Sequence, residues 1–115
     1  MMRAPKKKTS QFEYLKKDDA TFTRAAEIFR VMSAPMRLRI ISSLCAGEKN
    51  VTELLEEVAT TQSNMSQHLG TLFQAGILVK RREGVQIYYS IANPNFVELC
   101  HAVCNQIESE SLESV

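Results

Sequence analysis

The segment formed by residues 50–76 constrains the fold of this chain more than any other part of the sequence. Two groups of apolar residues recur in it at helical spacing. They are Val51, Leu54, Leu55 and Val58 in the first group and Met65, Leu69, Leu72 and Phe73 in the second. Residues 59–61 lie between the groups and leave room only for a tight turn. The spacing therefore predicts two short helices joined by a corner, the second of which covers residues 62–75.

The outward face of this second helix is polar but uncharged. It carries Gln62, Ser63, Ser66, Gln67 and Gly70. A helix that only needs to be soluble usually exposes charged residues on that face. Amides and hydroxyls both donate and accept hydrogen bonds, as the base edges in the major groove of DNA require. We therefore interpret residues 50–76 as a helix-turn-helix whose second helix reads DNA.

Three further helices are predicted from apolar spacing. One starts near residue 18, and the next starts at Pro35 and is stopped by Gly47. The last follows Pro94 and continues to about residue 110. The first and last helices each carry one apolar stripe outside the reading segment. We expect these two helices to pair with those of a second copy in a homodimer.

A β-hairpin is predicted directly after the recognition helix. Residues 77–82 and 85–91 are rich in β-branched and aromatic side chains, and they flank the pair Glu83-Gly84. Such a chain is mainly α-helical with a small hairpin, which is the winged helix-turn-helix fold, here over residues 18–112. The wing residues predicted to contact DNA are Lys80, Arg81, Arg82 and Gln86.

Composition limits the function further. With 115 residues, 44% of them apolar, and a net charge of +1, the chain fits one domain and not a strong non-specific polyanion binder. Residues 1–17 are predicted to form a flexible basic arm, solvated or in contact with DNA phosphate. The absence of a long apolar run predicts a cytoplasmic protein without a membrane segment. No CxxC, Gly-rich phosphate loop or paired carboxylates indicate an enzyme, and a winged helix used only for protein contacts remains the other alternative.

Four short motifs connect this pattern to a known family. They are SAPMRL at residues 33–38, QSNMSQHL at 62–69, AGIL at 75–78 and YSI at 89–91. Through them the chain resembles the ArsR/SmtB family of bacterial metal- and thiol-responsive repressors over roughly residues 20–110. The resemblance implies a homodimeric repressor that binds an imperfect palindrome in double-stranded DNA and is released by an inducer.

The resemblance also implies which residues of the recognition helix face or flank DNA. They are Gln62, Ser63, Asn64, Ser66, Gln67 and His68. A helical wheel agrees for four of them and places Asn64 and His68 nearer the buried side. For His68, packing or a backbone contact is therefore a full alternative to base reading.

Two metal sites of the family lack their ligands in this sequence. The closely spaced cysteines of the third helix are replaced by residues 51–54, VTEL. The ligand positions of the last helix correspond to Asn93, Asn95, Gln106 and Ser109. Neutral amides and a hydroxyl are poor substitutes for imidazole and carboxylate around a metal cation. We therefore predict neither metal site, and no cofactor.

Three cysteines remain as candidate sensors. Cys45 in the second helix and Cys100 and Cys104 in the last are similar in layout to the persulfide- and redox-responsive branch of the family. That likeness implies that Cys45 and Cys104 become linked on oxidation, although each is displaced by about one turn from the cysteine of that branch. A direct disulfide requires Cα atoms within about 7 Å. Alternatively, all three thiols hold arsenite or another soft metal, or they simply pack.

Overall fold

The computed structural model describes residues 17–113, which fall into two units that divide between Arg30 and Val31. Each unit is described by itself. The predicted basic arm lies outside the described residues, apart from Lys17. Within the range 17–113, no helix is long and apolar enough to cross a membrane.

The first unit contributes most of helix α2, Asp19–Met32. The helix is capped by Asp18, whose carboxylate accepts a hydrogen bond from the backbone N–H of Thr21 at 2.9 Å. This bond lowers the pKa of the Asp18 carboxyl. The apolar side chain of Phe29 is 56% exposed, whereas Val31 and Met32, which belong to the second unit, are buried. The predicted apolar stripe of the first helix is therefore covered only at its end.

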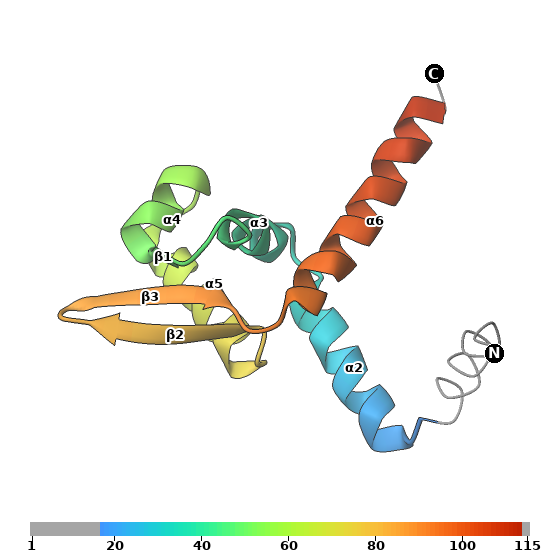
Figure 1. Cartoon of the computed structure of the whole chain (residues 1–115), viewed down its shortest axis with the longest axis horizontal. Coiled ribbons are helices and arrows are strands. Elements are labelled where there is room, and N and C mark those ends of the chain that lie inside the picture. The colour runs from blue at the N-terminus through green and yellow to red at the C-terminus, as the bar shows by residue number, and fades with distance from the viewer. Residues whose placement is uncertain (1–16, 114–115) are drawn as a thin grey trace, which may run out of the picture. The chain divides into compact units, whose positions relative to one another are not determined.

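The second unit contains the remaining elements (Figure 1). They are α3 (Pro35–Leu44), β1 (Lys49–Asn50), α4 (Val51–Glu57), α5 (Gln62–Gln74), β2 (Leu78–Glu83), β3 (Gln86–Ile91) and α6 (Pro94–Glu113). The strands form one antiparallel sheet in the order β1-β3-β2. Figure 1 shows β2 and β3 projecting from the helices as a long two-stranded ribbon. The predicted winged helix-turn-helix is thus confirmed.

Local capping sets the ends of α4 and α5. The side chain of Asn50 accepts from the backbone N–H of Glu53, and the Glu53 carboxylate accepts from the backbone N–H of Asn50. This reciprocal capping box satisfies two N–H groups that the helix leaves open. Thr61 caps α5 by accepting from the N–H of Asn64 at 3.0 Å. Gly76, with φ of +80°, ends α5 in the left-handed conformation that glycine adopts without strain.

The core lies where α3, α4, α5 and the start of the wing meet. Its buried apolar residues are Ile40, Ile41, Leu44, Leu54, Val58, Met65, Leu69, Leu72, Ala75, Ile77 and Leu78, together with Val31 and Met32. No polar or charged residue is buried among the described residues. The inward face of α5 is held by Met65, Leu69 and Leu72, which are all 0% exposed. The polar face of α5 must therefore point outward.

Strand β1 was not predicted from the sequence. Lys49 and Asn50 pair with Tyr89 and Tyr88 of β3 and extend the hairpin to three strands. Two residues are too few to produce a recognisable alternation of polar and apolar side chains. Because Asn50 also caps α4, the strand joins the wing to the start of the helix-turn-helix.

The turn of the wing lies one residue later than predicted. Glu83 still belongs to β2 and pairs with Gln86, so the two-residue loop is Gly84-Val85. Gly84 has φ of +64°, the conformation that such tight hairpin loops require. Val85, at the tip of the wing, is 90% exposed.

Candidate DNA-binding interface and cysteine cluster

The outward face of α5 displays most of the predicted reading residues. The exposed ones are Gln62, Ser63, Asn64, Ser66 and Gln67, and we call this set the reading face. Asn64, which the helical wheel placed nearer the buried side, lies in the first turn and is exposed. These side chains can donate to and accept from base edges without any rearrangement of the core behind them.

His68 stands at the edge of this face and is half-buried. Its Nδ1 accepts a hydrogen bond from Nε of Arg37 in α3 at 3.2 Å. The same guanidinium donates through another nitrogen to the backbone carbonyl of Val31 at 3.0 Å. This link between Arg37 of α3 and α5 was not predicted from the sequence. The place of Arg37 in the SAPMRL motif was the only signal in the sequence.

The three basic residues of the wing lie in different surroundings. Strand alternation places Lys80 and Arg82 on one face of β2 and Arg81 on the other. Lys80 lies with Nζ 4.3 Å from the centre of the Phe73 ring of α5, and Arg82 donates to the carbonyl of Gly84 at 3.3 Å. Neither pairs with a carboxylate in the described part of the chain. Both cations therefore remain available to an anion such as a DNA phosphate.

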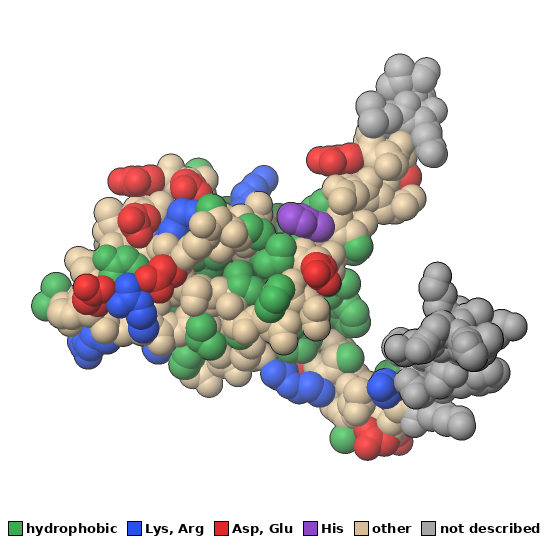
Figure 2. Space-filling model, viewed as in Figure 1, with side chains coloured by type: hydrophobic (Ala, Val, Ile, Leu, Met, Phe, Trp, Pro, Cys, Tyr) green, Lys and Arg blue, Asp and Glu red, His purple; other side chains and the backbone are tan. Residues whose placement is uncertain are grey.

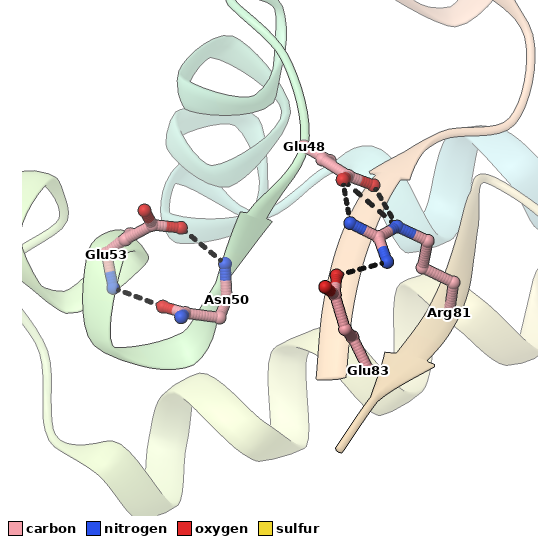
Figure 3. A network of polar contacts seen from close by, with 5 residues as sticks. All are labelled: Glu48, Asn50, Glu53, Arg81 and Glu83. Carbon is pink, nitrogen blue, oxygen red and sulfur yellow. Dashed lines mark hydrogen bonds and ion pairs between the residues drawn. The ribbon is translucent and has the colours of Figure 1, made fainter. Parts of the chain in front are cut away.

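Arg81 is instead held between two carboxylates (Figure 3). Its guanidinium donates to both oxygens of Glu48 and to Glu83, the latter at 2.7 Å. It also lies over the ring of Tyr88. The hydrogen bonds with Glu48 and Glu83 raise the pKa of Arg81, and the bond from Arg81 lowers the pKa of the Glu48 carboxyl. Figure 2 likewise shows acidic side chains directly beside basic ones at the wing.

Gln86, the remaining predicted wing contact, is exposed at the start of β3. Its side-chain oxygen accepts from the amide nitrogen of Asn50 at 3.3 Å. Gln86 therefore connects the wing to the cap of α4, and its amide nitrogen has no partner among the described residues.

The three cysteines are free thiols with unequal exposure. Cys45 is exposed and forms the C-cap of α3, so it lies just beyond the helix in which it was predicted, and its thiol donates to the carbonyl of Ile41 at 3.4 Å. Cys104 is exposed on α6, and Cys100 is half-buried. Burial, followed by the charges of Cys104 and Cys45, raises the pKa of the Cys100 thiol. The raised pKa favours the protonated thiol form of Cys100.

Cys45 also borders an open groove of about 470 Å³. The end of α3, the end of β3 and the start of α6 form its walls. Its lining includes Cys45, Glu48, Val97 and Glu98. Because Glu48 also binds Arg81, the groove adjoins both the exposed thiol of Cys45 and the ion pair between Glu48 and the wing.

The structure does not bring metal ligands together. Among residues 17–113, no three His, Cys, Asp or Glu side chains form a group that could hold a metal ion. At the start of α6, Asn93 accepts from the backbone N–H of Asn95 at 2.9 Å, and Gln106 donates to Glu110 at 3.2 Å. Three of the four residues that replace the metal ligands of the family therefore make local hydrogen bonds along α6.

A helix-turn-helix with an exposed polar second helix and a basic two-stranded ribbon defines the winged helix-turn-helix class. Comparison with known proteins agrees with this class. Residues 34–80 match the family model described as "Bacterial regulatory protein, arsR family".

The transcriptional repressor PagR of Bacillus anthracis is 36% identical over 85 residues, which cover 73% of this chain and 80% of PagR. The regulator Rv0081 of Mycobacterium tuberculosis is 43% identical over 75 residues, 64% of this chain. The match spans 66% of the length of Rv0081.

Solved structures are similar over most of the chain. Reduced HlyU from Vibrio cholerae has a TM-score of 0.67 at 27% identity, covering 74% of this chain and 93% of HlyU. The homodimeric winged helix-turn-helix DNA-binding domain of Mb0332 from Mycobacterium bovis has a TM-score of 0.71 at 26% identity, covering 87% and 94%. The chain belongs to the ArsR family of bacterial transcriptional regulators, and it is a regulator, not an enzyme.

Proposed function

We propose that this protein is a homodimeric, DNA-binding transcriptional repressor that leaves its operator when its cysteines are oxidised or persulfidated. The observation that carries the DNA-binding part is the reading face of α5, which is exposed, polar and uncharged. The wing adds Lys80 and Arg82 as phosphate contacts. The similarity to PagR, which is a transcriptional repressor, supports the same role here.

Unpaired apolar surface supports the dimer. On α2, Phe29 is 56% exposed, and on α6, Val103 and Ile107 are 54% and 55% exposed. Large apolar side chains left in water at helical spacing favour burial against another surface. The Mb0332 domain is a homodimer with the same fold. We expect α2 and α6 to form the interface and to set the distance between the two copies of α5, as a palindromic site requires.

The chemistry of the cysteines supports a thiol-based inducer. Thiolates, not thiols, attack sulfur and peroxides. Cys45 and Cys104 are exposed and can be reached by an oxidant, whereas Cys100 is half-buried and its pKa is raised by burial. One similar solved structure is of HlyU from Vibrio cholerae in its reduced form. Such chemistry suits the cytoplasm, where thiols are kept reduced until an oxidant or a reactive sulfur species arrives.

Linking Cys45 to Cys104 would tie the end of α3 to α6. A disulfide forms with loss of two protons and two electrons to the oxidant, and polysulfide could instead insert a longer sulfur chain. Only a bond that strains the DNA-bound geometry more than the free geometry can release DNA. Glu48 lines the same groove as Cys45, so we expect an adduct on Cys45 to disturb the ion pair between Glu48 and Arg81.

Intact mass and DNA binding, measured together, test this proposal. The protein is treated with polysulfide, peroxide or arsenite, and its binding to a duplex from its own promoter region is followed by gel shift. We expect a mass shift and loss of binding with polysulfide or peroxide. The variant Cys104→Ser should bind DNA with unchanged affinity and lose this response.

Two results would contradict the proposal. A double variant, Cys45→Ser with Cys104→Ser, that still responds to polysulfide and peroxide would exclude the sensor pair. Release by arsenite alone would favour the soft-metal alternative, which uses the same cysteines with Cys100. The variant Cys100→Ser is the matched control, because it should abolish an arsenite response and leave the oxidative response intact.

A further inference from the structure

We propose that Arg37 is a positioning residue, which holds His68 in the tautomer that presents Nε2–H to a DNA phosphate. Nε of Arg37 donates a hydrogen bond to Nδ1 of His68 at 3.2 Å. This role of Arg37 rests on the proposed function, because it assumes that α5 faces DNA.

The bond leaves only one assignment of the imidazole proton. A guanidinium group has donors and no acceptor, so Nδ1 of His68 must be the acceptor. A neutral imidazole whose Nδ1 accepts carries its proton on Nε2. Arg37 therefore decides which nitrogen of His68 is the donor.

The second nitrogen of His68 is open to solvent. No other hydrogen bond to His68 is present in the described part of the chain. Among the described residues, no buried side-chain nitrogen or oxygen lacks a hydrogen-bond partner. Since Nε2 has no partner, it must be accessible. His68 directly follows the exposed Gln67 of the reading face, so an unused N–H donor lies at the border of that face.

A phosphate is the acceptor that fits this donor. Base edges in the major groove mix donors and acceptors, whereas phosphate oxygens only accept. A half-buried ring at the edge of the reading face has little reach into the groove. Its N–H can instead contact the backbone beside the groove and fix the register of α5 without selecting a base.

Arginine is required for this arrangement because it serves two acceptors at once. The second donor bonds the carbonyl of Val31 at 3.0 Å, in the last turn of α2, where helix carbonyls lack partners within the helix. The planar fork of Arg37 thus has a fixed orientation when it reaches His68. A lysine ammonium is a single point of charge and cannot hold both acceptors in this geometry.

Two conservative variants of His68 separate its two nitrogens. In His68→Gln the amide nitrogen lies near the position of Nε2, so the donor to DNA is kept. In His68→Asn the amide lies near the position of Nδ1, so the partner of Arg37 is kept and the outer donor is lost. On the promoter duplex, we expect His68→Asn to bind about a hundredfold more weakly, because each of the two subunits loses one hydrogen bond to a charged group, worth about tenfold. The variant His68→Gln should bind close to wild type.

The tautomer of the His68 imidazole gives a direct test of the role of Arg37. Nitrogen-15 NMR of the imidazole, recorded without DNA, should show the proton on Nε2 in wild type and a mixture of tautomers in Arg37→Lys. The variant Arg37→Lys should also weaken DNA binding, and the loss should largely disappear in the His68→Gln background, because glutamine has no tautomer to fix. An equal loss in both backgrounds would mean that Arg37 acts only through the fold and would overturn the proposal.

The outcomes also distinguish this inference from the proposed function. A wild-type protein that does not bind the promoter duplex would contradict the repressor proposal, while the NMR result would still report on Arg37 and His68. Proton occupancy on Nδ1 in wild type, or full affinity in His68→Asn, would reject the inference even if the protein represses transcription. Thermal melting of each variant checks that the fold is retained.

Discussion

Two glycines of this protein should respond in opposite ways to the same added methyl group. A Cβ built at Gly70, inside α5, meets no atom within 4 Å, and the same holds for Gly84 at the turn of the wing. Steric clash therefore plays no part at either site. Gly70 has an ordinary helical backbone, whereas Gly84 has φ of +64°. The backbone conformation alone should decide the sign of the effect.

The expected change in the free energy of unfolding of each glycine variant follows from the energy of its backbone conformation. Glycine inside a helix is less favourable than alanine by about 1 kcal/mol, so Gly70→Ala should raise the free energy of unfolding by about 0.5–1 kcal/mol. Placing an L-residue in the left-handed region is unfavourable by about 1–2 kcal/mol. Gly84→Ala should therefore lower the free energy of unfolding by about 1 kcal/mol or more. In a domain of this size, 1 kcal/mol corresponds to a shift in Tm of roughly 4–8 °C.

Urea unfolding followed by circular dichroism measures both effects. All variants must be compared at one protein concentration, because dimerisation contributes to the measured stability. A lower midpoint for Gly70→Ala, or a higher one for Gly84→Ala, would refute the argument. Because Gly70 belongs to the predicted outward face of α5, its methyl group should also weaken DNA binding while the fold becomes more stable. A loss of binding through unfolding could not produce that combination.

Three further predictions concern the wing and the core. Arg82→Ala should reduce the salt dependence of DNA binding by about two units of slope, one for each subunit of the dimer. Arg81→Ala should reduce it by clearly less, because two carboxylates already neutralise Arg81. Equal slopes for the two variants in a salt titration would contradict this. The depressed pKa of Glu48 means that its bond to Arg81 contributes stability above the ordinary value of 4.5 and that this contribution is lost as pH falls through the lower folded value. Glu48→Gln should therefore lose less stability than wild type on acidification, as measured by urea midpoints above and below that value. Leu69→Ala, at a side chain that is 0% exposed, should cost about 2–5 kcal/mol of unfolding free energy in the same assay.

The sequence predicted those parts of the fold that depend on neighbouring residues. The caps at Asn50 and Thr61 each involve a partner three residues away, and the stop at Gly76 depends on one backbone conformation. Apolar spacing then fixed which side of α5 is buried. Such signals repeat within one or two helical turns, so they can be read without knowing the tertiary structure.

The parts that escaped prediction depend on contacts between distant residues. Arg81 and Glu48 are 33 positions apart, and Arg37 and His68 are 31 apart. Nothing in the local pattern distinguishes an arginine that is braced by a carboxylate from one that is free to meet phosphate. The same holds for the cysteines, because the pKa of Cys100 is raised first by burial in the folded chain and then by the charges of Cys104 and the distant Cys45.

The short strand β1 has a mechanical consequence. Asn50 pairs with the wing through β3 and caps α4 in the same position, so the wing and the helix-turn-helix share a residue. We therefore expect the wing and the helix-turn-helix of each subunit to move together. For a dimer that binds DNA through two such units, the spacing between its two half-sites should then be fixed. Inserting or deleting base pairs between half-sites should accordingly abolish binding, even when every contacted base is kept.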